Sequence, residues 1–357
     1  MADATDYGKI IVLTGAGASA ALGLHTMASF PGLLASAGQP LADLAQKMHW
    51  EKRRADVEWI YDRLEMYVEA GKAAGEGDLN LQHAMGGSLS VERFGNQGAE
   101  ALAQLQGLML EHWGRVDAAD PGALSLYELT LVKLRQLNDA PLRVFTTNYD
   151  LTFEKFAERN MERVVNGVRP RGLDYVWDPA TYAHVDDAAA FVVYRLHGCS
   201  HWFQDDSGEV RYQPSPDLAR RGLRPMVVFP ARSKSDQVYD DIFAFAYGEF
   251  RRALAQAGVC VVIGSSLRDR GVRDSIANAD RATRFVVVDK GLQLEDVAAA
   301  LGHNHGALVQ EEFGIEDVNE HLLRLAEAGL RGHWIWGVHR RDEDSPEGWV
   351  TDAGVET

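Results

Sequence analysis

Residues 9–24 read KIIVLTGAGASAALGL, and this stretch decides the fold. A run of branched apolar residues leads into a glycine-rich turn, after which small residues follow in a helical pattern. Gly15, Gly17 and Ala20 match the pattern G-x-G-x-x-[G/A] directly after the predicted strand. Glycines at this place let a backbone approach a diphosphate, while the helix N-terminus presents free N–H groups to it. Glycines are also found where a strand–helix turn is tightly packed, but in this context the pattern favours nucleotide binding.

Similar apolar runs recur along the chain and alternate with helical patterns. They lie in LRVFTTN (142–148), FVVYRLHG (191–198), PMVVFP (225–230), GVCVVIGSS (258–266) and TRFVVVD (283–289). Helical patterns cover residues 150–160, 237–257, 272–282 and 295–301. Nearly continuous apolar strands are typical of a parallel sheet that helices cover on both faces. The alternation predicts an α/β fold, a Rossmann-like doubly wound parallel sheet.

One region, residues 31–139, breaks this alternation because it contains no strand pattern. Apolar residues between 51 and 68 recur at helical spacing, and residues 102–113 and 124–137 are also predicted to be helical. The glycine-rich piece from 71 to 98 is predicted to be a loop. We therefore predict a helical insertion, whose role as scaffold, lid or oligomer contact stays open.

The predicted domain limits follow from these patterns. A Rossmann-like nucleotide-binding domain is expected over residues 1–30 and 140–330, with the helical insertion at 31–139 and a C-terminal tail at 331–357. The tail contains Trp334, Trp336 and Trp349 in a mostly polar, loop-like context. Such aromatics suggest either a tail docked on its own domain or a contact with a partner.

Composition narrows the classes of protein. The chain has 357 residues, 46% of them hydrophobic, and a net charge of −16, which disfavours binding to nucleic-acid phosphates. Two cysteines, Cys199 and Cys260, are too few for a disulfide framework or a four-cysteine zinc site, so no metal is expected. The polar N-terminus has no signal-peptide pattern, so we expect a cytoplasmic protein without a membrane span.

Small polar groups follow three of the predicted strands. They are found at 146–150 (TTNYD), at His197, and at 264–266 (GSS). In an open α/β sheet the ligand binds beyond the carboxyl ends of the strands, so these groups are predicted to line one site. No acidic residue follows the glycine loop at the distance that a Rossmann dehydrogenase requires, and Asp289 or the hydroxyls of GSS could serve the adenosine ribose instead.

Five motifs, GAGAS, TTNYD, LHG, GSSL and VVVD, are present in the order and spacing of the sirtuin superfamily, over residues 10–289. The chain most resembles the branch of bacterial anti-phage defence whose members hydrolyse NAD. The resemblance implies residues that hold the diphosphate and nearby ribose: Gly15, Ala16, Gly17 and Ser19. It places Asn148 and Asp150 beside the nicotinamide ribose and matches His197 to the catalytic histidine. Further residues are predicted to line the NAD site, with Ser265 and Asp289 on the adenosine side: Thr147, Gly264, Ser265, Ser266 and Asp289.

Two departures from the sirtuin deacylases bear on the activity. The four-cysteine zinc module is missing after His197, where HWFQDDSGEVRYQ instead predicts a short hairpin around Ser207 and Gly208. The Phe-Arg pair expected after the glycine loop is missing too. We therefore expect an NAD glycohydrolase that releases nicotinamide and ADP-ribose, with NAD as substrate and no metal. An NAD-dependent lysine deacylase and a non-catalytic NAD- or ADP-ribose-sensing subunit remain alternatives.

The expected roles follow from residue chemistry and the resemblance. Asn148 would orient a water through one accepted and one donated hydrogen bond, although it could equally form an Asx turn. Asp150 would contact the ribose or the nicotinamide amide, or cap the following helix. His197 would bind a ribose hydroxyl and assist proton transfer. A Cys199–His197 nucleophile is disfavoured, and the charged run 268–274 reads as a solvated helix start or a subunit contact.

The resemblance also implies a partner. It points to a HerA-type hexameric translocase ATPase as partner. Because unrestrained NAD hydrolysis would kill the host, we also predict control through self-association as a homo-oligomer. The acidic charge predicts no direct contact to nucleic acid, and no membrane contact is expected.

Overall fold

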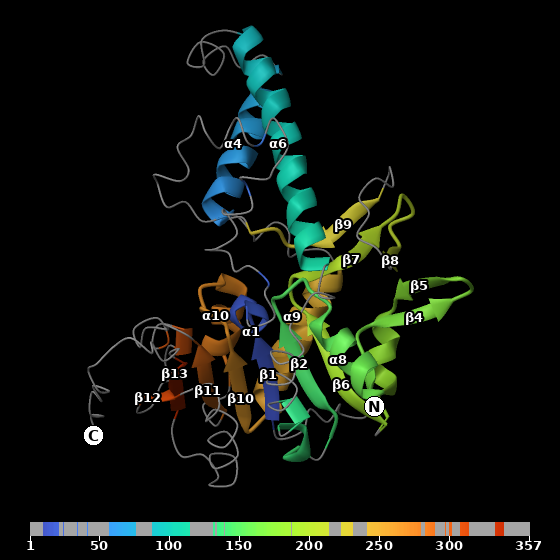
Figure 1. Cartoon of the computed structure of the whole chain (residues 1–357), viewed down its shortest axis with the longest axis vertical. Coiled ribbons are helices and arrows are strands. Elements are labelled where there is room, and N and C mark those ends of the chain that lie inside the picture. The colour runs from blue at the N-terminus through green and yellow to red at the C-terminus, as the bar shows by residue number, and fades with distance from the viewer. Residues whose placement is uncertain are drawn as a thin grey trace.

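The computed structural model describes residues 10–20, 24, 34, 41, 57–75, 88–114, 131–132, 134–138, 140–186, 188–213, 223–230, 241–279, 283–289, 297, 300–301, 308–313 and 333–338. Eight strands form a parallel sheet in the order β12-β13-β11-β10-β1-β2-β6-β3 (Figure 1). They are β1 (Ile10–Thr14), β2 (Leu142–Thr146), β3 (Arg163–Val165), β6 (Ala189–Arg195), β10 (Val259–Ile263), β11 (Arg284–Asp289), β12 (Leu308–Phe313) and β13 (His333–Val338). The predicted parallel sheet is confirmed.

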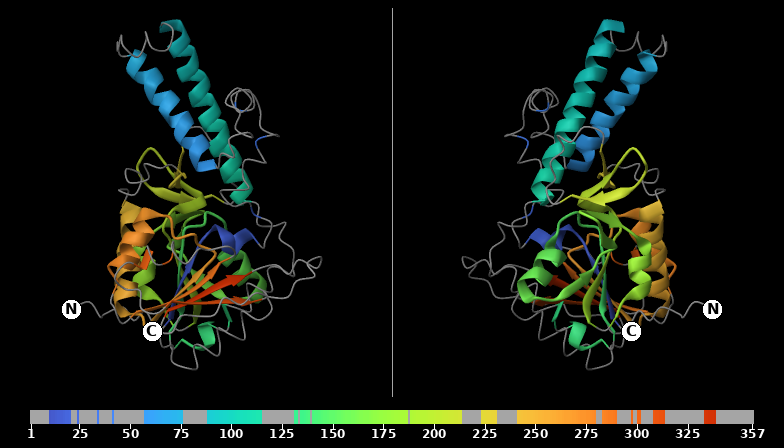
Figure 2. Two further views of the ribbon diagram at one scale, coloured as in Figure 1. Left: turned by 90° about the vertical axis from the view of Figure 1, so that its left-hand side faces the viewer. Right: turned by 90° about the vertical axis from the view of Figure 1, so that its right-hand side faces the viewer.

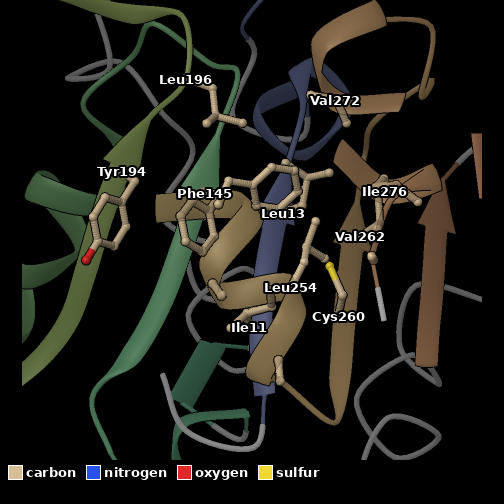
Figure 3. Close-up of a cluster of buried hydrophobic side chains, with 14 of the residues drawn as sticks. Ile11, Leu13, Phe145, Tyr194, Leu196, Leu254, Cys260, Val262, Val272 and Ile276 are labelled. Carbon is tan, nitrogen blue, oxygen red and sulfur yellow. The ribbon is translucent and has the colours of Figure 1, made fainter. Parts of the chain in front are cut away.

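Helices cover both faces of this sheet. Helices α9 (Asp241–Gln256) and α10 (Arg270–Ala277) pack on one face, and α1 (Ala16–Ala20) and α8 (Thr152–Asn160) pack on the other. Strand β1 alternates between the two cores, because successive side chains of a strand point to opposite faces. Ile11 and Leu13 lie in the α9/α10 core (Figure 3), while Val12 lies in the α8 core. The doubly wound prediction is therefore correct.

A second, antiparallel sheet lies at the carboxyl end of the first. Its strands, in the order β4-β5-β8-β7-β9, are β4 (Val168–Arg171), β5 (Asp174–Trp177), β7 (Gly198–Gln204), β8 (Val210–Tyr212) and β9 (Arg224–Val227). A short 3-10 helix, η3 (Pro179–His184), follows β5. The predicted hairpin around Ser207 and Gly208 is confirmed as the β7–β8 turn. The assignment of PMVVFP to the parallel sheet is wrong, because β9 pairs antiparallel with β7.

The expectation of a loop-like tail over 331–357 is wrong for residues 333–338. These residues form β13, which pairs along one edge with β11 and along the other with β12. Pairing on both edges satisfies the backbone N–H and C=O groups of this strand, which explains why a segment rich in aromatic residues is part of the sheet. The remaining domain limits stay a prediction, and residues 339–357 lie outside the described part of the chain.

Two long helices stand out from the body of the molecule (Figure 2). They are α4 (Val57–Gly75) and α6 (Ser88–Gly114), both within the predicted insertion. Tyr61 Oη accepts a hydrogen bond of 2.7 Å from Gln106 Nε2, while Gly71 faces Gly95, so the helices run antiparallel. None of the helices in the described ranges is long and apolar enough to cross a membrane.

The loop predicted over 71–98 is wrong for residues 71–75 and 88–98, which are helical, while residues 76–87 lie outside the described part of the chain. Gly71 lies in α4 and Gly95 in α6, and a Cβ on Gly71 would lie 2.5 Å from the Cα of Gly95. The two backbones approach each other closely at this point, and only glycine leaves room for that approach. Gly71 and Gly95 therefore mark helix–helix packing.

Gly71→Ala should destabilise the chain by about 1–3 kcal/mol, because the added methyl group overpacks the α4–α6 contact. Gly248→Ala is the matched control, since Gly248 lies within α9 and a Cβ there meets nothing within 4 Å. That control should be neutral or stabilise by up to about 1 kcal/mol through higher helix propensity. Urea unfolding of both variants measures the difference, and equal stability of the two would contradict the packing account.

Candidate active site

The loops after β1 and β10 leave the sheet toward opposite faces. Helix α1 follows β1 on the α8 face, and α10 follows β10 on the α9 face, although the two strands are neighbours. In open α/β sheets such a switch point is where ligands bind, beyond the carboxyl ends of the strands. The glycine motif after β1 and the GSSL motif after β10 therefore meet at this point.

The two loops pack backbone against backbone. Gly17 N donates to Gly264 O at 2.7 Å, and a Cβ on Gly15 would lie 2.7 Å from the same oxygen. Gly264 has a φ of +63°, a left-handed conformation that favours glycine, and a Cβ on it would overlap the amide nitrogen of Ala18. These glycines are thus required for contact between the loops, whatever ligand they bind.

This packing uses several amides that the sequence suggested for a diphosphate. Gly15 N donates to Ile263 O at 3.0 Å, Gly17 N to Gly264 O, and Ala18 N to Gly15 O at 2.9 Å. A donor that already has an acceptor is poorly placed to bind a phosphate oxygen. These three amides are therefore disfavoured for the predicted diphosphate contact, and contact by Ala16 and Ser19 stays a prediction.

A buried hydrogen-bond network joins the glycine loop to the end of β2. Asn148 Nδ2 donates to Gly15 O at 2.9 Å and to Ser19 Oγ at 2.8 Å. The serine hydroxyl in turn donates to Asp150 Oδ2 at 2.7 Å. The sequence placed Ser19, Asn148 and Asp150 around one ligand, and the structure brings these three buried side chains into direct contact.

The network fixes which atom Asn148 offers to a ligand. Both hydrogens of its Nδ2 group have acceptors within the chain, and the backbone N–H donates to Thr146 Oγ1 at 3.0 Å. No residue in the described ranges donates to Asn148 Oδ1. Asn148 was expected to accept one hydrogen bond from a water and to donate another to it. With both Nδ2 hydrogens already used, the side chain can only accept from a water, through Oδ1.

Asp150 serves the local structure as well as the network. Its Oδ1 accepts from the backbone N–H of Thr152 at 3.0 Å and from the hydroxyl of the same residue, at the start of α8. The N-cap of α8 is Leu151, which makes no side-chain capping bond, so the alternative that Asp150 is the N-cap is wrong. The Asp150 carboxylate instead closes an Asx turn just before the helix. Both carboxylate oxygens have partners within the chain, so Asp150 holds Ser19 in place and adds negative charge beneath the site.

A buried ion pair supports this segment from below. Arg195, 1% exposed, donates through Nη2 to both carboxylate oxygens of Glu154 at 2.7 and 2.6 Å. Its Nη1 donates to the carbonyl oxygens of Asp150 at 2.7 Å and Asn148 at 3.4 Å. Burial alone would raise the pKa of Glu154, but the charge and hydrogen bonds of Arg195 hold that pKa below its ordinary value.

The residues between these polar groups anchor the segment on its other side. Tyr149 stacks on Trp113 of α6, with ring centroids 4.1 Å apart, and donates to Val228 O at 2.6 Å. Leu151 packs in the core beneath the small sheet. The side chains of 148–151 therefore alternate between the polar network and two apolar cores, although the chain has left β2 and bends at Asp150. This alternation explains why β2 ends in a polar cluster.

His197 lies where the chain passes from β6 into β7. Its backbone oxygen accepts from Val228 N at 2.9 Å, and Gly198 after it has a φ of +83°. The buried imidazole places Nε2 3.2 Å from Asp269 Oδ2 and 3.2 Å from Tyr247 Oη. Strands β2 and β6 are neighbours, so Asn148 and His197 follow the carboxyl ends of adjacent strands.

The remaining predicted residues occupy different places. Thr147 N donates to Thr14 O at 3.0 Å, and Ser265 is buried while Ser266 is exposed. Asp289 ends β11, where its backbone pairs with Gly337 of β13. These residues stand at the same end of the sheet as the network. Their contact with a nucleotide stays a prediction.

Two other expectations concern cysteine and metal. Burial raises the pKa of the Cys199 thiol to about 11 in spite of the nearby charge of Arg195, so the thiol is protonated at neutral pH. That disfavours a cysteine nucleophile. Within the residues that the structure describes, no group of three or more His, Cys, Asp or Glu side chains could hold a metal ion.

Four supporting residues were missed at the level of sequence: Glu154, Arg195, Tyr247 and Asp269. A signal was present for Arg195, since a charged residue inside the apolar run FVVYRLHG is rarely buried without a partner. The partners themselves are far apart in sequence, and no local pattern joins them.

A scan against models of protein families found no match for this chain, and a search of curated proteins found none either. The solved structures that it resembles include a mutant Sir2 homologue in complex with 2'-O-acetyl-ADP-ribose, at 15% identity and a TM-score of 0.47, over 90% of this chain and 94% of that one. A Sir2 homologue–NAD complex aligns over 91% of both chains at 15% identity with a TM-score of 0.44. Sir2 bound to an acetylated peptide aligns over 90% of this chain and 92% of that chain, at 17% identity with a TM-score of 0.38.

Glu154→Gln should destabilise the fold by about 3–5 kcal/mol at neutral pH, because Arg195 would remain buried without its counter-ion. The folded pKa of Glu154 lies below its ordinary value, so the stabilisation is present above about pH 4.3, the unfolded pKa, and is lost as the pH falls through the folded pKa. The difference between wild type and variant should therefore shrink in acid.

Urea unfolding from pH 7 to pH 3 measures that difference. Glu158→Gln is the matched control, since Glu158 lies on the same helix with a side chain 74% exposed and a 3.5 Å pair to Lys155. The control should change stability by less than about 0.5 kcal/mol. A Glu154→Gln variant as stable as this control would refute the supporting role of the pair.

Proposed function

We propose that this chain is an NAD hydrolase, an NAD glycohydrolase that cleaves NAD to nicotinamide and ADP-ribose. The observation that carries the proposal is the buried network of Ser19, Asn148 and Asp150 at the sheet's switch point, with His197 after the adjacent strand. The motif resemblance to sirtuins supports the same choice of substrate. NAD is the substrate in this proposal, and no metal takes part.

Hydrolysis of NAD requires that the positive charge developing at the anomeric carbon be stabilised. The bond between nicotinamide and ribose breaks through an oxocarbenium-like state, and neutral nicotinamide leaves. Asn148 Oδ1, held by two donated hydrogen bonds from its own Nδ2, would accept a hydrogen bond from the attacking water and present partial negative charge. The buried carboxylate of Asp150 would add negative potential at the same place.

His197 would complete the reaction. In the proposal its imidazole binds a hydroxyl of the nicotinamide ribose and accepts the proton that the attacking water loses. Water then forms the new bond to the anomeric carbon, and ADP-ribose is released. The glycine loop and the GSSL loop would hold the rest of the dinucleotide, with Ser265 and Asp289 on the adenosine side.

The segment after His197 bears on the deacylase alternative. Where sirtuin deacylases carry a zinc module, this chain forms β7 and β8 of the small sheet. An acyl-lysine substrate is therefore not part of the proposal. The biological role that we propose, as an effector of bacterial anti-phage defence, rests on the motif resemblance alone.

One assay separates the proposed hydrolase from its alternatives. The chain is incubated with NAD, with and without an acetylated peptide, and free nicotinamide, ADP-ribose and acetylated ADP-ribose are measured. We expect nicotinamide and ADP-ribose in equal amounts without peptide. Release that requires the peptide would establish a deacylase, and binding of NAD without release would establish a sensing subunit.

Asn148→Ala should lower kcat by about 10²–10³-fold, the usual cost of removing one preorganised polar group from a transition state. The side chain also satisfies Gly15 O and Ser19 Oγ, so the fold should lose about 1–3 kcal/mol. Turnover is therefore compared at a temperature where unfolding curves show both proteins folded. Asn160→Ala, which removes a hydrogen bond to Phe156 O at the end of α8, is the control. A folded Asn148→Ala variant with wild-type turnover would exclude the proposed role.

His197→Ala should lower turnover strongly while NAD still binds, since the loops after β1 and β10 remain intact. Calorimetric titration with NAD and a nicotinamide assay measure the two properties separately. If neither property changes, the match of His197 to the family's catalytic histidine is coincidental.

We further propose that the chain assembles into a homo-oligomer and is controlled by a HerA-type hexameric ATPase. Unrestrained hydrolysis of NAD would harm the cell that makes it, which is the argument for such control. Light scattering of the chain alone and with a co-expressed ATPase of this type tests both ideas. A monomer that hydrolyses NAD at full rate, unchanged by the ATPase, would refute them.

A further inference from the structure

We propose that Asp269 and Tyr247 are positioning residues that fix His197 in a single tautomer, with the proton on Nε2 and the lone pair on Nδ1. The inference rests on the proposed function for its catalytic meaning. It assigns Nδ1 as the nitrogen that receives a proton from the substrate side. Neither positioning residue belongs to the motifs that first marked the site.

The geometry around Nε2 supplies two acceptors. Asp269 Oδ2 lies 3.2 Å from His197 Nε2, and Tyr247 Oη lies at the same distance. The tyrosine hydroxyl donates its own hydrogen to Asp269 Oδ1 at 3.2 Å, so its oxygen faces the histidine as an acceptor. Both neighbours of Nε2 therefore favour a hydrogen on that nitrogen. A neutral imidazole then keeps its lone pair on Nδ1.

The state of the tyrosine agrees with this arrangement. Burial, followed by the charge of Asp269, raises the pKa of Tyr247 well above its ordinary value. The phenol therefore stays protonated and can keep donating to Asp269. A Cβ on Gly271 of α10 would lie 3.0 Å from the tyrosine ring and hydroxyl, so this glycine makes room for the ring.

Asp269 is itself held by the start of α10. Its Oδ1 accepts from Val272 N at 2.9 Å, which makes it the N-cap of the helix. The preceding turn contains Leu267 at a φ of +54°, an uncommon left-handed conformation for a buried leucine. After that turn, the Asp269 carboxylate contacts both the N-terminus of α10 and His197. Backbone strain at such a place is common next to functional residues.

The proposed effect is orientation of the histidine and choice of its tautomer. An acid that holds a catalytic histidine through one ring nitrogen leaves the other nitrogen free to act as a base, and an amide in the acid's place can reverse the tautomer. Asp269→Asn tests this directly. Its amide oxygen can still accept from Val272 N and Tyr247 Oη, while its NH2 group would face Nε2 and favour the tautomer with the proton on Nδ1.

We expect Asp269→Asn to lower kcat by about 10²–10⁴-fold, the range of general acid–base catalysis, with little change in the KM for NAD. Asp274→Asn is the matched control, since Asp274 lies on the same helix with a side chain 62% exposed and pairs with Arg270 at 3.6 Å. It removes the same charge and should keep wild-type kinetics. Tyr247→Phe should lower kcat by only about threefold to tenfold, because Asp269 Oδ2 still faces Nε2.

The decisive readout needs no turnover. Nitrogen-15 NMR of ring-labelled histidine, with the signals of His197 identified by their loss in His197→Gln, reports which ring nitrogen carries the proton. We expect the Nε2–H form in wild type, Asp274→Asn and Tyr247→Phe, and the Nδ1–H form in Asp269→Asn. An unchanged tautomer in a folded Asp269→Asn variant would overturn the inference, as would wild-type kcat for that variant. If wild type releases no nicotinamide, the proposed function fails, and the tautomer spectra still decide the positioning role.

Discussion

The four residues 148–151, which follow β2, are held in one register, because their side chains are fixed alternately on two sides. Asn148 and Asp150 enter a buried hydrogen-bond network with Ser19, while Tyr149 and Leu151 enter apolar cores on the other side. A shift of one residue would place two polar groups in apolar cores, at a cost of several kcal/mol. Arg195 reinforces the arrangement by holding two carbonyl oxygens of the same segment.

This constraint couples parts of the molecule that are distant in sequence. The helical pair α4–α6 reaches the segment through Trp113 and Tyr149, and the small sheet reaches it through Val228, which accepts from Tyr149 and donates to His197. On the opposite side, the glycine loop contacts the segment through Gly15 and Ser19. The site is therefore assembled only when both sheets and the helical pair are folded together, and its side chains are positioned before any ligand binds.

Local sequence patterns predicted the parts of the fold that depend on local physics. Apolar runs and helical spacing gave the central strands, α8, α9 and α10, because periodicity reflects which faces are buried. The errors arose where distant contacts decide. Gly71 and Gly95 were predicted to lie in a loop, but each allows two helices to pack closely. Residues 333–338 were predicted to be a tail, but they pair with a strand on each edge.

In the candidate site, too, local motifs predicted some residues, and long-range contacts decided the others. Ser19, Asn148 and Asp150 could be grouped from their motifs, and the structure joins them by hydrogen bonds. Asp269 looked like part of a solvated charged run, because nothing in the sequence near residue 269 indicates that a turn at Leu267 brings it to His197. Long-range polar contacts of this kind require the tertiary structure, since the partners are far apart in sequence and no local pattern joins them.

The most direct test of the account is a crystal structure of the His197→Ala variant with NAD bound. The account predicts the anomeric carbon of the nicotinamide ribose above Asn148, with Oδ1 bonded to a water about 3–3.5 Å from that carbon, the separation of a near-attack arrangement. The hydrogen bonds from Asn148 to Gly15 and Ser19 should be unchanged. A dinucleotide bound with its nicotinamide ribose away from Asn148, or an Asn148 turned out of the network to donate to the ligand, would contradict it.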